Sequence, residues 1–180
     1  MLKFLSAASL ALVAGQAFAE NPEVGGAAMF ADKTIVENAM NSADHTTLVA
    51  AVVAAGLAET LSGEGPFTVF APVNAAFDAL PAGTVDNLLL PENMATLQKI
   101  LTCHVVAAEA FSADIIGMIE ADGGMHPVET IGGCILQASV MDGMVTLTDE
   151  NGTVATVTIA DVDRSNGVIH VIDAVMLPAM

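Results

Sequence analysis

Two short apolar segments, about a hundred residues apart, constrain the fold of this chain more than any other feature. The first runs from Gly65 to Pro72, and the second runs from Asn166 to Asp173 and leads to Pro178. Each is a run of β-branched or aromatic residues that ends near a proline, and the second is entered through an Asn-Gly pair that favours a tight turn. The pattern predicts two buried strands that bracket one domain.

The first nineteen residues have the pattern of a secretory signal peptide, with a cation at Lys3, an apolar stretch from Leu10 to Ala14, and small residues at Ala17 and Ala19. We therefore expect cleavage before Glu20. The apolar stretch is shorter than the roughly 20 residues that cross a bilayer. We expect no membrane insertion, and a mature protein that is secreted or periplasmic.

The charge of the chain excludes some partner classes. The sequence has 21 acidic residues and 4 Lys and Arg, for a net charge of −17. Removal of the signal peptide would leave Lys33, Lys99 and Arg164, and a net charge near −18. Nucleic acids and anionic lipids require clustered cations, so neither is expected as a partner. Cationic or cation-bridged partners remain open, and so does a role in solubility alone.

Periodicity divides the rest of the chain into helices followed by strands, which is an α+β pattern. We expect residues 20–30 to be a flexible lead-in and residues 31–178 to be a single domain. Helical spacing covers 34–40, 46–55, 57–61, 74–80, 84–90, 93–105 and 112–121. Alternation between Gly-containing turns predicts strands at 127–131, 135–141, 144–148, 154–160 and 168–171.

A third segment, Leu101-Thr102-Cys103-His104-Val105-Val106, lies between the two apolar segments. In this order and spacing the three resemble the signature regions of the fasciclin-like domain family, an extracellular adhesion module, with Cys103 at a position where the family has tyrosine. The resemblance covers Ala31 to Pro178. It implies a fasciclin-like fold in which N-terminal helices pack on a twisted antiparallel β-wedge.

The resemblance also implies which residues have structural and contact roles. The family's Tyr-His segment is implicated in receptor contact, so His104, Cys103 and Asp173 are candidate partner-binding residues. The alternative is a hydrogen-bonded scaffold, in which Asp173 would need a backbone amide or a hydroxyl such as that of Thr68. The structural signature comprises Thr68, Phe70, Pro72, Asn74, Phe77, Asn166, Gly167, His170 and Asp173.

Cys103 and Cys134 are the only cysteines. Because an exported chain meets an oxidising compartment, we expect them to form a disulfide. The alternative is a pair of buried free thiols that act as small hydrophobic groups.

The sequence does not indicate an enzyme. It has no Gly-x-Ser-x-Gly turn and no phosphate-binding glycine loop. Cys103 and His104 are neighbours, but adjacent helical residues point about 100° apart and would not pair as nucleophile and base. We therefore expect neither catalysis nor a cofactor.

A metal site is not expected either. The four histidines lack the close spacing of zinc ligands. Residues 161–167 partly resemble a calcium-binding loop, but the glycine comes one position late and Ile172 occupies the place of the closing glutamate. The histidines are His45, His104, His126 and His170.

Together these observations predict a secreted or periplasmic adhesion module that binds a cell-surface, matrix or biofilm component, either a protein or a glycan. Two alternatives remain. One is a carrier of an apolar, carotenoid-like ligand, since ten methionines give soft apolar surfaces. The other is an envelope stress protein that binds another exported protein.

Overall fold

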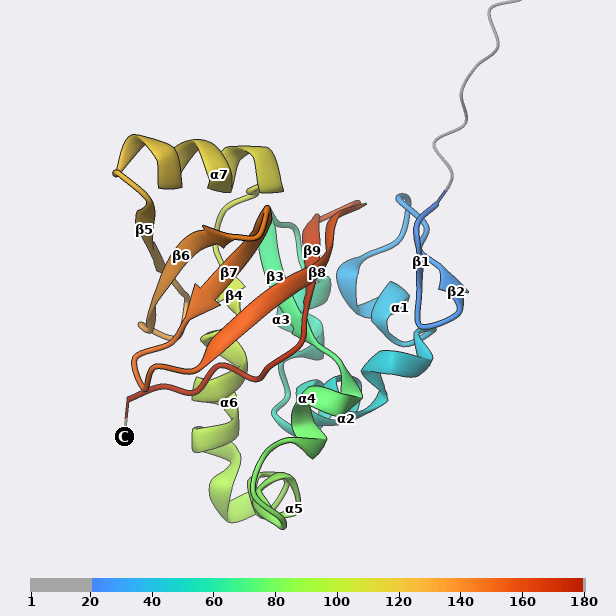
Figure 1. Cartoon of the computed structure of the whole chain (residues 1–180). Helices are drawn as coiled ribbons and strands as arrows, with labels where there is room; N and C mark the ends of the chain where they lie inside the picture. Colours follow the sequence, from blue (N-terminus) through green and yellow to red (C-terminus); the bar gives the residue numbers. More distant parts are fainter. Residues whose placement is uncertain (1–20, 180) are drawn as a thin grey trace, which may run out of the picture.

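A seven-stranded mixed sheet runs through the protein, with strand order β4-β3-β9-β8-β7-β6-β5 (Figure 1). The structure is a computed structural model that describes residues 21–179, so the expected signal peptide lies outside the described residues. The strands are β3 (Phe67–Pro72), β4 (Val105–Val106), β5 (Met125–Glu129), β6 (Ile135–Met141), β7 (Met144–Thr148), β8 (Val154–Arg164) and β9 (Gly167–Ile172).

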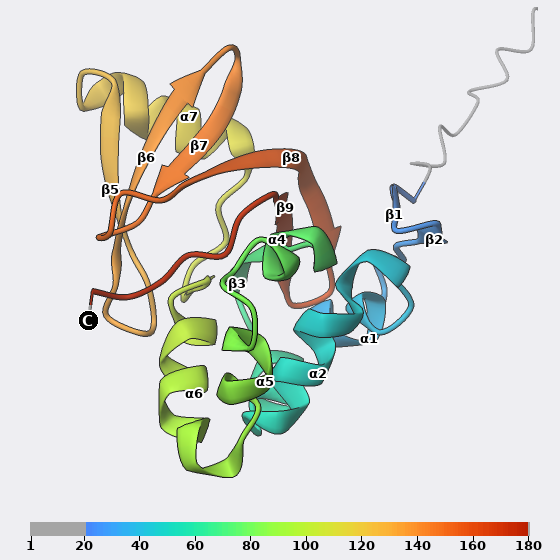
Figure 2. The same ribbon diagram turned by 60° about the horizontal axis from the view of Figure 1, so that its bottom comes forward.

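Helices cover the two faces of this sheet unequally. The first six helices gather on one side of β3 and β9, and the seventh lies over β5, β6 and β7 (Figures 1 and 2). They are α1 (Ile35–Ala39), α2 (Thr46–Ala54), α3 (Ala58–Ser62), α4 (Asn74–Asp78), α5 (Thr84–Leu88), α6 (Met94–Thr102) and α7 (Ser112–Ala121), with 3-10 turns at Ala43–His45 and Pro91–Asn93.

The two apolar segments form β3 and β9, which are neighbours in the sheet and are buried on both faces. Val69 and Ile169 face the helices α1 to α6, whereas Phe70 and Ile172 face a second core beneath α7. A strand with a core on each side needs apolar residues at successive positions and not at alternate ones. The double burial explains the continuous apolar runs in the sequence.

The pairing of β3 with β9 is parallel, with Phe67 opposite Gly167 and Pro72 opposite Ile172. The expected antiparallel pairing is found between all the other neighbouring strands, from β5 to β9 and between β3 and β4. The expectation is wrong only for the central pair, β3 with β9. A parallel pair needs a long connection between its strands, and here most of the domain provides it.

The chain start also differs from the sequence-based expectation. Residues 20–30 were expected to be a flexible lead-in, but Glu23–Val24 (β1) and Ala27–Ala28 (β2) form a small hairpin. Val24 and Met29 are buried among the residues of the helical core. Because the apolar positions in this Gly- and Ala-rich stretch are few, their packing was not evident from periodicity.

Two other local expectations are corrected. The helix expected at 93–105 ends at Thr102, and Val105 enters β4 beside β3. Asn74 was expected to cap its own helix, but its side-chain oxygen instead accepts from the Thr47 N–H at 3.0 Å, near the start of α2. The residue is therefore a link between α2 and α4, because its amide group also donates to the Ala43 carbonyl at 2.8 Å.

Asn166 and Gly167 connect the helical layer to the central strands. The Asn166 side chain accepts from the Ile35 N–H at 3.0 Å and donates to the carbonyls of Leu61 and Gly63 at 2.7 and 3.0 Å. Gly167 has φ of +149°, and a Cβ there would lie 1.9 Å from the Phe67 carbonyl oxygen. The tight turn before β9 thus requires Asn166 for its side-chain hydrogen bonds and Gly167 because a side chain there would collide with β3.

The expected disulfide is confirmed. Cys103 and Cys134 are bonded, with their Cα atoms 5.4 Å apart and a sequence separation of 31. Both are buried. The bond joins the end of α6 to the loop before β6, and so joins the helical layer to the β5–β7 wedge.

Replacement of Asn166 by alanine should lower the free energy of unfolding by about 3 kcal/mol, because buried backbone groups at Ile35, Leu61 and Gly63 lose their partner. Urea unfolding measures the change. The control Asn41→Ala removes an exposed side chain bonded within its own helix region and should cost less than about 0.5 kcal/mol. Equal stabilities of the two variants would contradict the role of Asn166.

Replacement of both cysteines by alanine should lower the free energy of unfolding by about 3 to 4 kcal/mol, since the bond closes a long loop in the unfolded chain. Urea unfolding with and without a reductant tests this. The reductant should destabilise the wild-type protein and leave the double variant unchanged. Reaction of two thiols in the unreduced wild-type protein, after unfolding, would show that the bond is absent.

Candidate functional site

His104 is buried between α6 and the C-terminal segment, and both of its ring nitrogens are used. Its Nδ1 lies 2.8 Å from the Ile100 carbonyl, which can only accept, so Nδ1 carries the proton. Its Nε2 accepts from the Met176 N–H at 2.9 Å. The histidine is therefore a neutral bridge between the helical layer and the segment that follows β9.

Thr68 and His170 hold the loop that leads into α7. The Thr68 hydroxyl donates to the Ala108 carbonyl at 2.6 Å and accepts from the Ala110 N–H at 2.9 Å. The Nε2 of His170 donates to the Ala110 carbonyl at 2.8 Å, and the ring stacks on Phe70. These signature residues position the second core and have no free polar atom directed at solvent.

Burial lowers the pKa of each of these histidines. For His104 desolvation is the dominant cause, and it outweighs the raising effects of the Ile100 bond and the Asp149 charge, so that the pKa falls to about 4. The pKa values of His45 and His170 are also lowered, again chiefly by desolvation. All three are thus neutral near pH 7, which suits an internal hydrogen-bonding role.

The three candidate contact residues do not form one exposed surface. Cys103 and His104 are 0% and 2% exposed, whereas Asp173 is exposed at the end of β9. Asp173 accepts from the Thr156 N–H at 2.7 Å on the neighbouring strand, and so its partner is not Thr68. A partner molecule can reach Asp173 directly, but it cannot reach the other two without rearrangement of the core.

Pro72 and Phe77 complete the signature as packing residues. Pro72 ends β3 and is buried, and Phe77 packs in the helical core. Together with Asn74, they link β3 to the start of α2. The polar signature residues of β3 and β9, Thr68 and His170, are buried and hydrogen-bonded to the backbone before α7.

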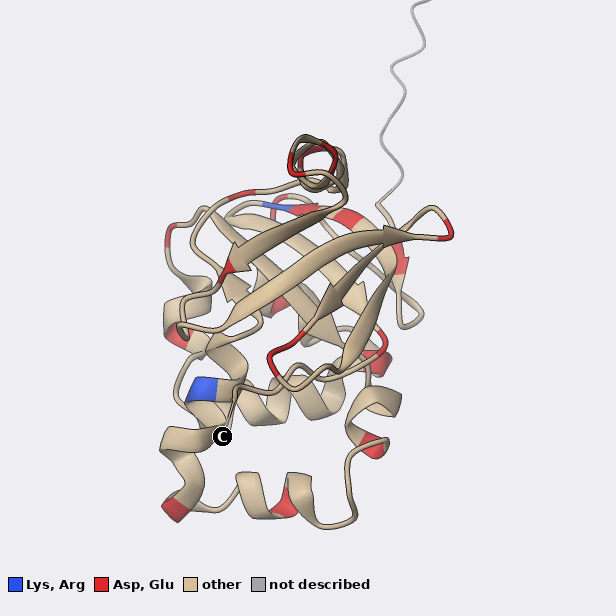
Figure 3. Cartoon of the chain, turned by 60° about the vertical axis from the view of Figure 1, so that its left-hand side comes forward, with Lys and Arg blue, Asp and Glu red and all other residues tan. Residues whose placement is uncertain are grey.

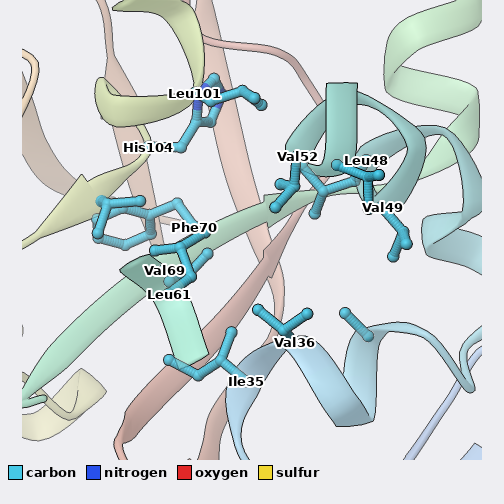
Figure 4. Close-up of a pocket in the computed structure, with 13 residues that line it drawn as sticks. Ile35, Val36, Leu48, Val49, Val52, Leu61, Val69, Phe70, Leu101 and His104 are labelled. Atoms are coloured by element: carbon cyan, nitrogen blue, oxygen red, sulfur yellow. The ribbon is translucent and has the colours of Figure 1, made fainter. Parts of the chain in front are cut away.

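An apolar hollow of about 40 Å³ lies between α1, α2, β3 and α6, with Ile35, Val52, Val69 and His104 among its lining residues (Figure 4). Pockets for drug-sized ligands measure about 300–1,000 Å³. The hollow is therefore a packing defect in the core and not a cavity that fits a polyene.

Asp161 and Arg164 have structural roles that no local sequence pattern indicates. Asp161 has φ of +59° and its carboxylate accepts from the Ser112 N–H at the start of α7, a contact that spans 49 positions and has no local pattern. Arg164 is 4% exposed, and its guanidinium has no hydrogen-bond partner among the described residues. Desolvation lowers the pKa of Arg164 to about 10, against a raising effect from Asp163.

Arg164 also lines a hollow of about 270 Å³ together with Glu64 and Glu109. The two carboxylates offset its single positive charge, so the hollow is not selective for anions. Between residues 21 and 179, no group of three or more His, Cys, Asp or Glu is placed to hold a metal ion. In the same range, no helix combines the length and apolarity that a membrane span requires.

Comparisons with known proteins agree with this architecture. A family model described as the fasciclin domain matches residues 43–178. Protein sll1483 of Synechocystis sp. is 53% identical over 147 residues, which are 82% of this chain and 74% of that protein. Cell surface glycolipoprotein MPB83 of Mycobacterium bovis is 34% identical over 166 residues, which are 89% of this chain and 68% of that protein.

Among solved structures, a FAS1 domain pair from the insect cell adhesion molecule Fasciclin I superimposes with a TM-score of 0.72 at 18% identity. The match covers 81% of this chain and 51% of the insect chain. The shared arrangement is a seven-stranded mixed sheet with helices, as in the structure described above. With a family model over residues 43–178 and a relative 53% identical over most of its length, the chain belongs to the fasciclin domain family.

Proposed function

We propose that this protein is an exported adhesion module that binds a cell-surface or extracellular protein or glycan through its exposed surface and performs no chemical step. The main support for this proposal is that the polar residues of the signature segments are buried and make their hydrogen bonds inside the protein. Thr68, His104, Asn166 and His170 are all buried, and each is hydrogen-bonded to the backbone of another segment. Such residues maintain a shape and leave recognition to other surfaces.

Export is supported by three features. The first nineteen residues have a signal-peptide pattern. The buried disulfide suits an oxidising compartment. A relative is named as a cell-surface glycolipoprotein. We propose that the mature protein begins at Glu20 and acts in the periplasm or outside the cell.

The charge distribution favours a partner with cations or bridging metal ions. Acidic residues are spread over helices, turns and strands, and few Lys or Arg residues lie among them (Figure 3). The field of such a surface raises the encounter rate with cationic groups and repels anionic ones. The small volume of the apolar hollow favours adhesion over the carrier alternative.

Deletion of the gene in the native organism should reduce attachment of the cells to a surface or to each other, and addition of the purified mature protein should restore it. The immobilised protein should also retain an extracellular protein or glycan from the envelope fraction, with calcium-free buffer as a second condition. Normal attachment of the deletion strain, together with no retained partner, would contradict the adhesion function.

The buried His104 should make stability depend on pH. Its pKa is lower in the folded state, about 4, than the ordinary value of 6.5, so the unfolded chain binds more protons between these values. The free energy of unfolding should be greatest above pH 6.5 and should fall by an amount on the order of 3 kcal/mol as the pH drops toward 4. Urea unfolding at a series of pH values measures this slope.

His104→Gln should flatten part of this slope and lower stability at pH 7, because the Met176 and Ile100 bonds are lost or weakened. His126→Gln is the control for the loss of stability at pH 7, since His126 is only partly buried and satisfies no buried backbone group, so this change should cost less than about 0.5 kcal/mol. If the slope of the His104 variant equals that of the wild-type protein, His104 is not the buried neutral bridge described here.

A further inference from the structure

Large apolar side chains are exposed at both ends of one face of the wedge formed by β5 to β8. We define the outer face of the wedge by Met125, Ile135, Met141, Met144 and Val154, which lie on the side opposite α7. These side chains are between 44% and 56% exposed. The alternate residues Leu136, Ala138 and Leu147 are buried against α7. A half-solvated antiparallel sheet normally places polar residues on its outer side, as Gln137, Ser139 and Thr146 are here, so the exposed apolar side chains at its two ends depart from that pattern.

The register of the strands divides the outer face into two apolar ends. Met141 pairs with Met144, and Met125 pairs with Ser139, which places the three methionines at one end. Ile135 lies at the other end, where Val154 pairs with Thr148. Met141 follows Ile135 by six positions along β6, a span of about 20 Å.

The middle of the outer face is polar, with Gln137 and Thr148 beside Ser139 and Thr146. The hydroxyls of Ser139 and Thr146 lie 2.8 Å apart and hydrogen-bond to each other. A molecule that lies across this face would therefore gain most of its contact free energy at the two apolar ends.

Each apolar end has an acidic border. Asp142 is in the turn between Met141 and Met144, and Asp122 is in the turn before Met125. At the other end, Glu129 pairs with Ile135, and Glu150 accepts from the Ile135 N–H at 3.4 Å. The sequence has no Lys or Arg between Lys99 and Arg164. Strands β5 to β7 and α7 therefore present apolar side chains and negative charge without any Lys or Arg.

From this combination we propose that the outer face of the wedge is the docking surface for a basic amphipathic segment of a partner protein. The inference rests on the proposed adhesion function and names its surface and partner class. A helix of about 13 residues spans 20 Å, so apolar side chains at its two ends would meet the methionine end and the Ile135 end. Lysines or arginines beside them would meet the bordering carboxylates, of which Asp122 is paired with His126 and Glu150 also accepts from the Ala179 N–H.

The composition of the face distinguishes this partner from others. Methionine side chains are flexible and polarizable, and they adapt to apolar groups of varied shape. A second copy of this chain would place acidic borders against acidic borders, and an anionic lipid surface would be repelled for the same reason. A basic segment is the partner for which both the apolar and the charged contacts are favourable.

Binding of two synthetic peptides tests the proposal. One is a 14-residue peptide of leucine and lysine with the leucines at i, i+3, i+4 and i+7 spacing, and the other has the same composition in an order without an apolar face. The mature protein should bind the amphipathic peptide at least about tenfold more tightly, because only this peptide can use both the apolar ends and the charged borders. Equal affinities, or no binding of either peptide, would overturn the proposal.

Substitutions on the outer face of the wedge test whether the peptide binds there. Replacement of Met125, Met141 and Met144 by glutamine should weaken binding of the amphipathic peptide about tenfold. The matched control, Met40→Gln with Met94→Gln, changes exposed methionines outside the wedge and should leave the affinity unchanged. Asp122→Asn with Asp142→Asn should weaken binding at low salt and reduce its salt dependence. The triple methionine variant should have the circular dichroism of the wild-type protein. If its affinity for the peptide is then unchanged, the outer face of the wedge is not the binding site.

The two proposals fail in different ways. If the triple methionine variant still restores attachment to the deletion strain, adhesion stands and uses another surface. If the peptide binds as expected but the deletion strain attaches normally, the docking surface stands and the adhesion function fails.

Discussion

The parallel pairing of β3 with β9 is the interaction on which the rest of the structure depends. It joins residues about a hundred positions apart, and it places one hydrophobic core on each side of the same two strands. Val69 and Ile169 contribute to the helical core, while Phe70 and Ile172 contribute to the core beneath α7. Loss of this pairing would expose both cores at once, so the pair links the stabilities of the two layers.

Buried polar side chains complete the connection between layers. Asn166 bonds the start of α1 and the end of α3. His170 and Thr68 hold the loop before α7. His104 holds the segment after β9. Each contact satisfies backbone groups that would otherwise be unpaired in the interior. A scaffold held in this way can present a constant surface. Recognition then depends on exposed faces such as the outer face of the wedge.

The sequence predicted the elements whose signals are local. The alternating pattern around Asp142-Gly143 gave the bounds of β6 and β7, and amphipathic spacing gave those of α7. The three signature segments gave the family and, through it, the fold class. The parallel centre of the sheet was missed because no local pattern specifies which strands become neighbours. The packing of Val24 was missed because a single apolar residue has no period.

The candidate site was the least predictable part. His104 is buried just after the end of α6, and its partner Met176 lies 72 positions away and has no sequence signal. The contact role came from the family resemblance, and burial leaves only Asp173 directly accessible among the three candidates. The apolar outer face was not singled out, because exposed methionines on a strand look like core residues until the register is known.

Amide hydrogen exchange, followed by mass spectrometry with and without a bound partner or the amphipathic peptide, tests the central claim most directly. Residues 67–72 and 167–172 should exchange most slowly, through global unfolding, and ligand binding should change protection chiefly in β5, β6 and β7. Rapid exchange in either central strand, or ligand-induced protection centred on residues 101–106, would contradict a buried scaffold with recognition at its outer surface.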